Sequence, residues 1–212
     1  MKACPRCQAT LETPLACSAC GVLISPPSDT QFDPFSIFGL ELAYPLEPAL
    51  LEKRLLRFTR LVHPDFFATA DSAQRAQAER SSATLNAAHE TLADDWARAD
   101  WIVRHLGGPD EQRERSMPQA FLLEVLDWNE TLDAARAAPS GLAERAAVER
   151  LTIELEQRRA ELFSSIARQL GPLPARASPA LLALRKDLNA ARYVEKTQAE
   201  IADLRLTQSL SF

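Results

Sequence analysis

All four cysteines of this chain lie within its first 20 residues, in the stretch CPRCQATLETPLACSAC. They form two Cys-x-x-Cys pairs with a spacer of nine residues between them: Cys4 with Cys7, and Cys17 with Cys20. Two tight turns that each present two thiolates can enclose one tetrahedral metal ion, and Pro5 and Gly21 suit such turns. The pattern predicts a structural zinc ion, bound by four cysteines in a small β ribbon. No position around that ion would stay open for catalysis.

Other uses of these cysteines fit the sequence less well. Two disulfides are disfavoured in a cytoplasmic protein. A thioredoxin-like redox pair needs a Cys-x-x-Cys that opens a helix in a βαβ unit, and no such unit surrounds these pairs. Iron, alone or in an iron–sulfur cluster, is also compatible with four thiolates. Zinc is therefore the preferred metal, and iron is the alternative.

The remaining sequence is rich in residues that favour helices. Alanine, leucine, glutamate and arginine are frequent, and the 212 residues include only six glycines. A net charge of −5 argues against a protein that coats nucleic acid. The chain has neither an apolar run of about 18 residues nor a secretory or transit signal at its start. We therefore expect a cytoplasmic protein without a membrane partner.

Several helices are predicted between residues 33 and 110. The stretch DPFSIFGL begins with a capping Asp33 and a proline and ends near Gly39, as expected of a short helix. Residues 47–63 form the clearest helix, with one apolar stripe: Leu51, Leu55, Phe58 and Val62. Three basic side chains lie on the opposite side of this helix: Lys53, Arg57 and Arg60. A fourth, Arg54, lies on the flank of that side. Further helices are predicted over residues 71–94 and 96–108.

The helix over residues 47–63 must end near His63, because a residue that precedes proline is disfavoured in the helical conformation. The tripeptide His63-Pro64-Asp65 is therefore expected in a loop. A catalytic role would need a nucleophile, and the sequence has no Gly-x-Ser-x-Gly and no cysteine beyond the ribbon. We expect the chain not to be an enzyme. The tripeptide is then either a helix stop, where a protonated histidine suits the helix dipole, or a signal for another protein.

Three more helices are predicted after the polar stretch PDEQRERS. They span residues 117–138, 142–170 and 180–205, and no strand-like alternation occurs among them. The first of them carries three leucines at helical spacing, with two carboxylates beside them: Leu122, Leu123 and Leu126, with Asp127 and Glu130. Such leucines form either the core of a helical bundle or a protein-binding patch.

Five motifs occur together along the chain: DPFSIFGL, the HPD tripeptide, LNAAHETL, RADWIV and AFLLEVLDWNETLD. This combination resembles the HscB family, the J-protein co-chaperones of iron–sulfur cluster assembly. The resemblance covers residues 33–212. It implies an all-α fold, in which a J-domain helical hairpin (33–110) precedes a C-terminal three-helix bundle (117–212). The zinc ribbon (1–25) and a linker (26–32) stand in front, as in some members of that family.

The resemblance implies that the chain acts by binding two other proteins. A DnaK/HscA-type chaperone, whose ATPase it would stimulate, is expected to bind these residues: Lys53, Arg54, Arg57, Arg60, His63, Pro64 and Asp65. An IscU-type iron–sulfur scaffold protein, which it would deliver to that chaperone, is expected to bind these: Leu122, Leu123, Leu126, Asp127, Glu130 and Tyr193. Two positions depart from the family pattern, since Phe66 stands where lysine or arginine is frequent and Tyr193 stands where phenylalanine is typical.

Two other functions are compatible with parts of the sequence. A J-protein for general folding, or for another client, would share the tripeptide and differ in what its C-terminal bundle binds. A zinc-ribbon adaptor for nucleic acid would carry basic or aromatic side chains around the cysteines, where only Lys2 and Arg6 are basic. We therefore expect no nucleic-acid partner. The linker is expected to isolate the ribbon, so that loss of Cys17 and Cys20 would leave the helices folded.

Overall fold

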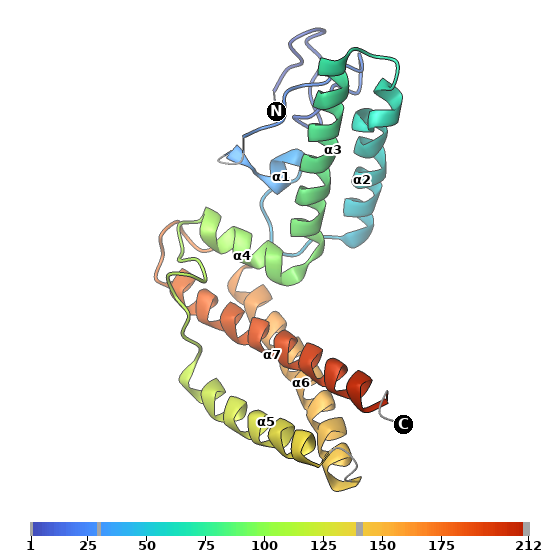
Figure 1. Cartoon of the computed structure of the whole chain (residues 1–212). Helices are drawn as coiled ribbons and strands as arrows, with labels where there is room; N and C mark the ends of the chain where they lie inside the picture. Colours follow the sequence, from blue (N-terminus) through green and yellow to red (C-terminus); the bar gives the residue numbers. More distant parts are fainter. Residues whose placement is uncertain (1, 29–30, 139–141, 210–212) are drawn as a thin grey trace. The chain divides into compact units, whose positions relative to one another are not determined.

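The computed structural model describes residues 2–28, 31–138 and 142–209 (Figure 1). Within these residues it contains seven α-helices, α1 to α7, and the short 3-10 helix η2. None of the helices described is both long and apolar enough to cross a lipid bilayer. The β structure of the described residues is limited to two isolated antiparallel bridges: Ala3 with Thr10, and Ala16 with Leu23. The predicted all-α fold class is therefore confirmed, whereas the predicted small β ribbon is not.

The chain forms two compact units, Met1–Arg98 and Ala99–Phe212. The division falls inside the helix α4 (Asp95–His105). The predicted boundaries of the ribbon, the linker, the J-domain and the bundle remain proposals. Parts of the predicted domains lie outside the described residues: residue 1 of the ribbon, residues 29 and 30 of the linker, and residues 139–141 and 210–212 of the bundle.

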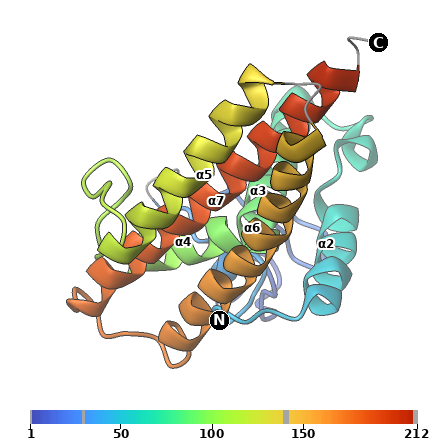
Figure 2. The same cartoon turned by 90° about the horizontal axis from the view of Figure 1, so that it is seen from below.

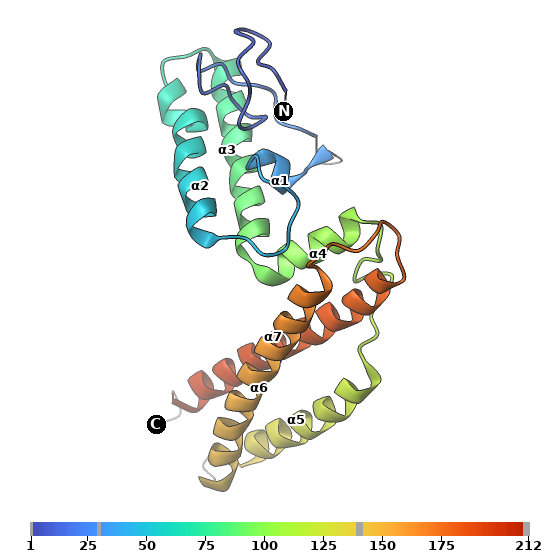
Figure 3. The ribbon, with the colours of Figure 1, turned by 180° about the vertical axis from the view of Figure 1, so that it is seen from behind.

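The helical part of the first unit is built around a hairpin of two long helices. Its elements are α1 (Pro34–Ile37), α2 (Pro48–Val62), η2 (Pro64–Phe67) and α3 (Ser72–Ala93). The helices α2 and α3 lie side by side, and α1 and η2 both pack against α3 (Figures 1 and 3). The apolar stripe predicted for α2 faces this core, since Leu51, Phe58 and Val62 are buried and Leu55 is half-buried.

Local signals in the sequence explain where α1 starts and stops. The carboxylate of Asp33 accepts hydrogen bonds from the backbone N–H groups of Phe35 (3.0 Å) and Ser36 (3.2 Å), which caps the helix. After the helix, Gly39 has a positive φ of 61°. A Cβ atom at this position would also lie 2.3 Å from the carbonyl oxygen of Glu12, so a larger residue would not fit. The cysteine spacer therefore packs closely against the turn after α1.

The second unit is a bundle of three long helices that follows the rest of α4. They are α5 (Gln119–Ala137), α6 (Leu142–Gln169) and α7 (Ala180–Ser209). The helices α6 and α7 pack along each other, and α5 lies against both of them (Figure 2). All three contribute buried apolar side chains to the core: Phe121, Trp128, Leu132, Leu155, Ile166, Leu184 and Leu188.

Buried polar side chains of α7 hold the segment that leads from α4 to α5. The guanidinium of Arg185 has no exposed surface, pairs with Asp100 and donates a hydrogen bond of 3.0 Å to a backbone carbonyl of that segment. The side-chain amide of Asn189 donates to the carbonyl oxygens of Glu114 and Ser116, both at 2.9 Å. These contacts hold the segment before α5 against α7.

Candidate metal centre and docking surfaces

The two Cys-x-x-Cys turns share one backbone conformation. In each turn the N–H group of the first cysteine donates to a carbonyl just after the turn: Cys4 to Ala9 (2.8 Å), and Cys17 to Val22 (3.0 Å). The residue after each second cysteine has a positive φ: 63° at Gln8 and 70° at Gly21. In the sequence only the glycine signals this conformation. Two equivalent turns therefore bring two thiols each to the same place.

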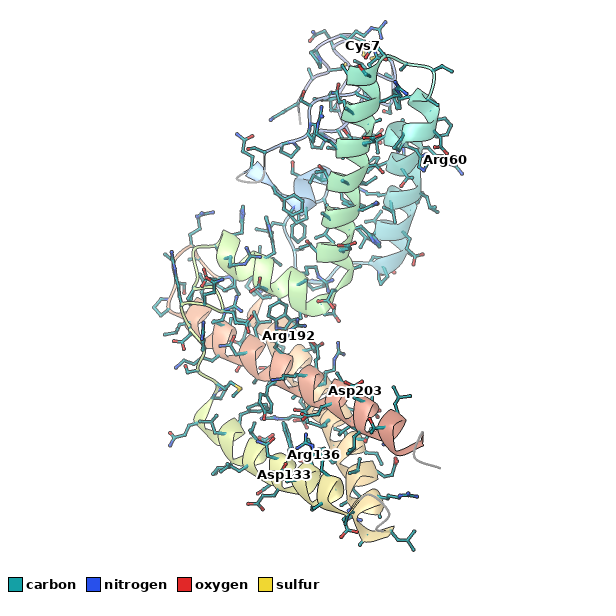
Figure 4. All side chains as sticks on the ribbon, viewed as in Figure 1. Cys7, Arg60, Asp133, Arg136, Arg192 and Asp203 are labelled. Atoms are coloured by element: carbon teal, nitrogen blue, oxygen red, sulfur yellow. The ribbon has the colours of Figure 1, made fainter. Side chains whose placement is uncertain are left out.

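The four thiols form one cluster. All four Sγ atoms lie within 4.8 Å of one another. Two of the separations are 3.7 Å between Cys4 and Cys20 and 3.6 Å between Cys7 and Cys17. Four sulfurs around a tetrahedral zinc ion, each about 2.3 Å from it, would be about 3.8 Å apart. The cluster thus has the donor atoms and the size of a metal site, and it lies near the surface because Cys7 is exposed (Figure 4).

Two thiols of the cluster, Cys4 and Cys7, differ in their pKa. Burial tends to raise the pKa of the Cys4 thiol, but hydrogen bonds from the backbone N–H groups of Cys7 and Arg6 outweigh burial and lower it to about 6. The N–H group of Ala9 tends to lower the pKa of Cys7, but Cys20 and the other thiols, together with burial, raise it to about 12. Thiolates that share a small volume repel one another, and a divalent cation relieves that repulsion as the protons leave. The close packing of the four thiols, which raises the pKa of Cys7, therefore suits the binding of a cation.

The outer face of α2 is basic. Lys53, Arg57 and Arg60 are exposed, and Arg60 extends on the side of α2 that is turned away from α3 (Figure 4). The helical spacing therefore placed these three side chains on the solvent side, as predicted. Together they form a positive surface along the helix that leads to the tripeptide.

Two arginines of α2 are already engaged within the first unit. Arg54 donates hydrogen bonds to the carbonyl oxygens of Phe38 and Gly39 and so holds the end of α1. Nη2 of Arg57 lies 2.7 Å from Oε1 of Glu12, which belongs to the cysteine spacer. The expectation that the linker isolates the ribbon is therefore wrong, because the ribbon contacts both α2 and the turn after α1. The sequence has no signal for these contacts, since the partners are far apart along the chain.

The helix α2 ends at Val62, directly before the tripeptide. His63 has the extended conformation (φ −62°, ψ 129°) that a following proline favours. The tripeptide then starts the 3-10 helix η2, whereas the sequence predicted a loop. Nδ1 of His63 accepts a hydrogen bond from the N–H group of Asp65 at 3.3 Å and lies 3.6 Å from its carboxylate. The Asp65 side chain is 86% exposed and that of His63 is 43% exposed, so both are accessible to a partner.

One face of α5 is apolar and open to solvent. Leu122, Leu123 and Leu126 are 44%, 68% and 59% exposed. Asp127 and Glu130 are exposed beside them. The opposite face of the helix packs into the bundle. These leucines are therefore not part of the bundle core. Their role as a protein-binding patch stays a prediction.

Tyr193 connects α7 to the helix that carries these leucines. Its ring meets the ring of Phe121 edge-on, with centroids 6.2 Å apart. Its hydroxyl donates a hydrogen bond of 3.3 Å to Oδ1 of Asn129. The side chain is half-buried, so Tyr193 both supports α5 and keeps part of its surface accessible.

Known proteins resemble this chain over both units. A family model described as the HSCB C-terminal oligomerisation domain matches residues 117–202. A co-chaperone protein HscB homolog of Bordetella pertussis is 37% identical over 134 residues, which cover 62% of this chain and 78% of the relative. This chain belongs to the HscB co-chaperone family. Another HscB homolog, of Haemophilus influenzae, is 29% identical over 176 residues, which cover 82% of this chain and 99% of the relative.

Solved HscB structures share the fold. The crystal structure of the human co-chaperone protein HscB has a TM-score of 0.77 at 22% identity, covering 97% of this chain and 100% of the human one. The chaperone HscB from Vibrio cholerae has a TM-score of 0.65 at 22% identity, covering 83% of this chain and 99% of that one. Membership of the HscB family also confirms that this chain is not an enzyme, because its relatives are named co-chaperones.

Proposed function

We propose that this HscB-family protein stimulates the ATPase of a DnaK/HscA-type chaperone and delivers an IscU-type scaffold protein to it in iron–sulfur cluster biogenesis. The co-chaperone names of its relatives support the general role. The observation that carries the proposal is the basic outer face of α2, which leads to an accessible His63-Pro64-Asp65 turn. ATP is bound and hydrolysed on the chaperone.

Charge and rigidity explain how this turn would act. The exposed cations of α2 attract an acidic surface and orient the protein on it, mainly by raising the rate of association. His63 and Asp65 then form hydrogen bonds at a defined place, because Pro64 restrains the backbone and η2 packs against α3. The turn forms and breaks no covalent bond, so its contribution is to binding.

The leucine face of α5 supports the second half of the proposal. Exposed apolar side chains with carboxylates beside them have the make-up of a protein-binding patch. Its partner would present an apolar surface edged by basic residues. We infer that the scaffold protein binds these residues: Leu122, Leu123, Leu126, Asp127 and Glu130, with Tyr193 at the contact to α7.

We also infer that the cysteine cluster holds zinc. Zinc in structural sites is bound tetrahedrally by four ligands, and four cysteine thiolates are one of its usual sets. The sulfur separations fit that geometry. Bound zinc would tie the two turns together and stabilise the ribbon. Cys4, Cys7, Cys17 and Cys20 supply all four ligands, so the ion takes no part in chemistry.

Single-turnover ATP hydrolysis by a purified DnaK/HscA-type chaperone tests the first half of the proposal. The wild-type protein is expected to accelerate hydrolysis, and the His63→Gln variant is expected not to. Circular dichroism of the variant checks that the helices remain, as expected for a half-exposed side chain. If the wild type leaves the rate of every such chaperone unchanged, the tripeptide is only a helix stop and the proposal is wrong.

Binding of a purified IscU-type scaffold tests the second half. The triple variant Leu122→Ala, Leu123→Ala, Leu126→Ala should lose most of the affinity, since it removes the exposed apolar face. Ile153→Ala is the matched control, because Ile153 is an exposed apolar residue of α6 (56% exposed). Unchanged binding by the triple variant, with ATPase stimulation intact, would instead favour a J-protein that serves another client.

A further inference from the structure

The 3-10 helix η2 presents one of its two phenylalanines to solvent. Phe66 is 68% exposed, whereas Phe67 is half-buried. The N–H group of Phe66 donates to the carbonyl oxygen of His63 at 3.1 Å, and the two rings meet edge-on with centroids 6.3 Å apart. The ring is therefore held beside the imidazole of the tripeptide and points to solvent.

A second exposed apolar side chain lies on the basic face of α2. Leu56 is 65% exposed and lines an open groove of about 480 Å³. The other residues of this groove all belong to α2: Ala49, Glu52, Lys53, Arg57 and Arg60. Lys53, Arg57 and Arg60 outnumber the one carboxylate, Glu52, of the groove. Glu12 also pairs with Arg57, and the groove still keeps a net positive charge around Leu56.

A single exposed apolar residue is common on protein surfaces and needs no function. Leu56 and Phe66, however, both lie where the proposed function places the chaperone. We propose that these two side chains are the apolar anchors of the chaperone-docking surface. The proposal rests on the co-chaperone function and extends it, because it assigns most of the affinity to residues other than the tripeptide and the cations.

Cations and apolar anchors contribute to binding in different ways. Exposed charge pairs raise the association rate, add little net affinity and are screened by salt. Most of the affinity of an interface comes from a few side chains that become buried in the partner, and aromatic residues are frequent among them. The surface of α2 and η2 therefore fits an acidic chaperone surface that contains apolar recesses for Leu56 and Phe66.

The test measures the apparent affinity of the full-length protein for a purified DnaK-type chaperone, from the concentration dependence of single-turnover ATP hydrolysis. Leu56→Ala and Phe66→Ala are each expected to weaken binding about tenfold or more. This loss should be the same at about 0.05 M and about 0.5 M salt, where the screening length falls severalfold. Lys53→Gln should weaken binding at the lower salt concentration and have little effect at the higher one.

Ile153→Ala is the control for the loss of an exposed apolar side chain elsewhere, and it should bind like the wild type. If both anchor variants bind like the wild type while His63→Gln fails to stimulate, the anchor proposal is wrong and the co-chaperone function stands. It is also wrong if the loss in the anchor variants disappears at high salt, or if Ile153→Ala loses as much affinity. If the wild type stimulates no chaperone, the proposed function and this inference both fall.

Discussion

Arg54, Arg57 and Arg60 lie on the same helix and have different surroundings. Arg54 holds the carbonyl oxygens at the end of α1, Arg57 pairs with Glu12 of the cysteine spacer, and Arg60 is exposed. Helical periodicity places each of them on the outer side or flank of α2, but the groups that engage them come from other parts of the chain. Only the fold therefore distinguishes a supporting arginine from one that is available to a partner.

At the same scale, Arg185 should contribute much more to stability than a surface arginine. Arg185→Leu is expected to lower the free energy of unfolding by about 3 kcal/mol, because it leaves the mostly buried carboxylate of Asp100 without its buried partner. Urea unfolding followed by circular dichroism measures the change.

Arg104→Gln is the matched control for this prediction. Arg104 pairs with the same carboxylate at 2.8 Å, but its side chain is 48% exposed, so its loss should cost about 1 kcal/mol or less. Equal losses in the two variants would contradict the view that burial sets the difference.

Among the elements, the ribbon depends on a different kind of contact from the helices. The described residues 2–28 contain no helix and no extended strand. Their backbone hydrogen bonds lie within one turn or the other, such as Leu11 to Lys2 and Ile24 to Leu15. The two turns meet at the thiol cluster. Leu15, two residues before Cys17, is also buried. A bound metal should therefore stabilise the ribbon much more than it stabilises the helices.

Removal of the metal with a chelator should unfold the ribbon and leave the helices in place. The circular dichroism signal at 222 nm should change little, because all the described helices lie outside the ribbon. Proteolytic cleavage within residues 8–16 should become faster. Loss of most of the helical signal would show that the hairpin of α2 and α3 needs the ribbon in order to fold.

The contact between the ribbon and α2 should be measurable as a coupling energy. In a double-mutant cycle of Glu12→Gln and Arg57→Gln, the coupling is expected to be about 0.2–1 kcal/mol, the usual range for exposed ion pairs. The parallel cycle of Glu12→Gln with Arg60→Gln, an exposed arginine of the same helix, should give no coupling. A coupling of zero in the first cycle would contradict the expectation that this ion pair stabilises the ribbon on α2.

At the scale of the whole molecule, the two units carry one proposed docking surface each. Residues in separate units without shared contacts should behave additively. His63→Gln should leave the affinity for the scaffold within about twofold of the wild type. The triple leucine variant should leave scaffold-independent ATPase stimulation within about twofold, and a variant that loses both activities would show that the surfaces depend on each other.

Most of the fold could be predicted because its signals are local. Asp33 and Gly39 mark the ends of α1, Pro64 ends α2, and apolar periodicity indicates the long helices that follow. Periodicity is less informative at the ends of a helix. The helix α7 extends to Ser209, past the predicted end at residue 205. The predicted β ribbon was not confirmed, since the described backbone of the two turns forms only isolated bridges.

The sequence by itself determined the helices, the grouping of four cysteines and the position of the tripeptide, because caps, periodicity and Cys-x-x-Cys spacing act over a few residues. The tertiary structure alone decided that Leu122, Leu123 and Leu126 face solvent. It also decided that Glu12 meets Arg57 and that Phe66 is exposed while Phe67 is half-buried. These facts depend on which surfaces the folded chain brings together, and contacts between distant residues leave no periodic signal in a single sequence.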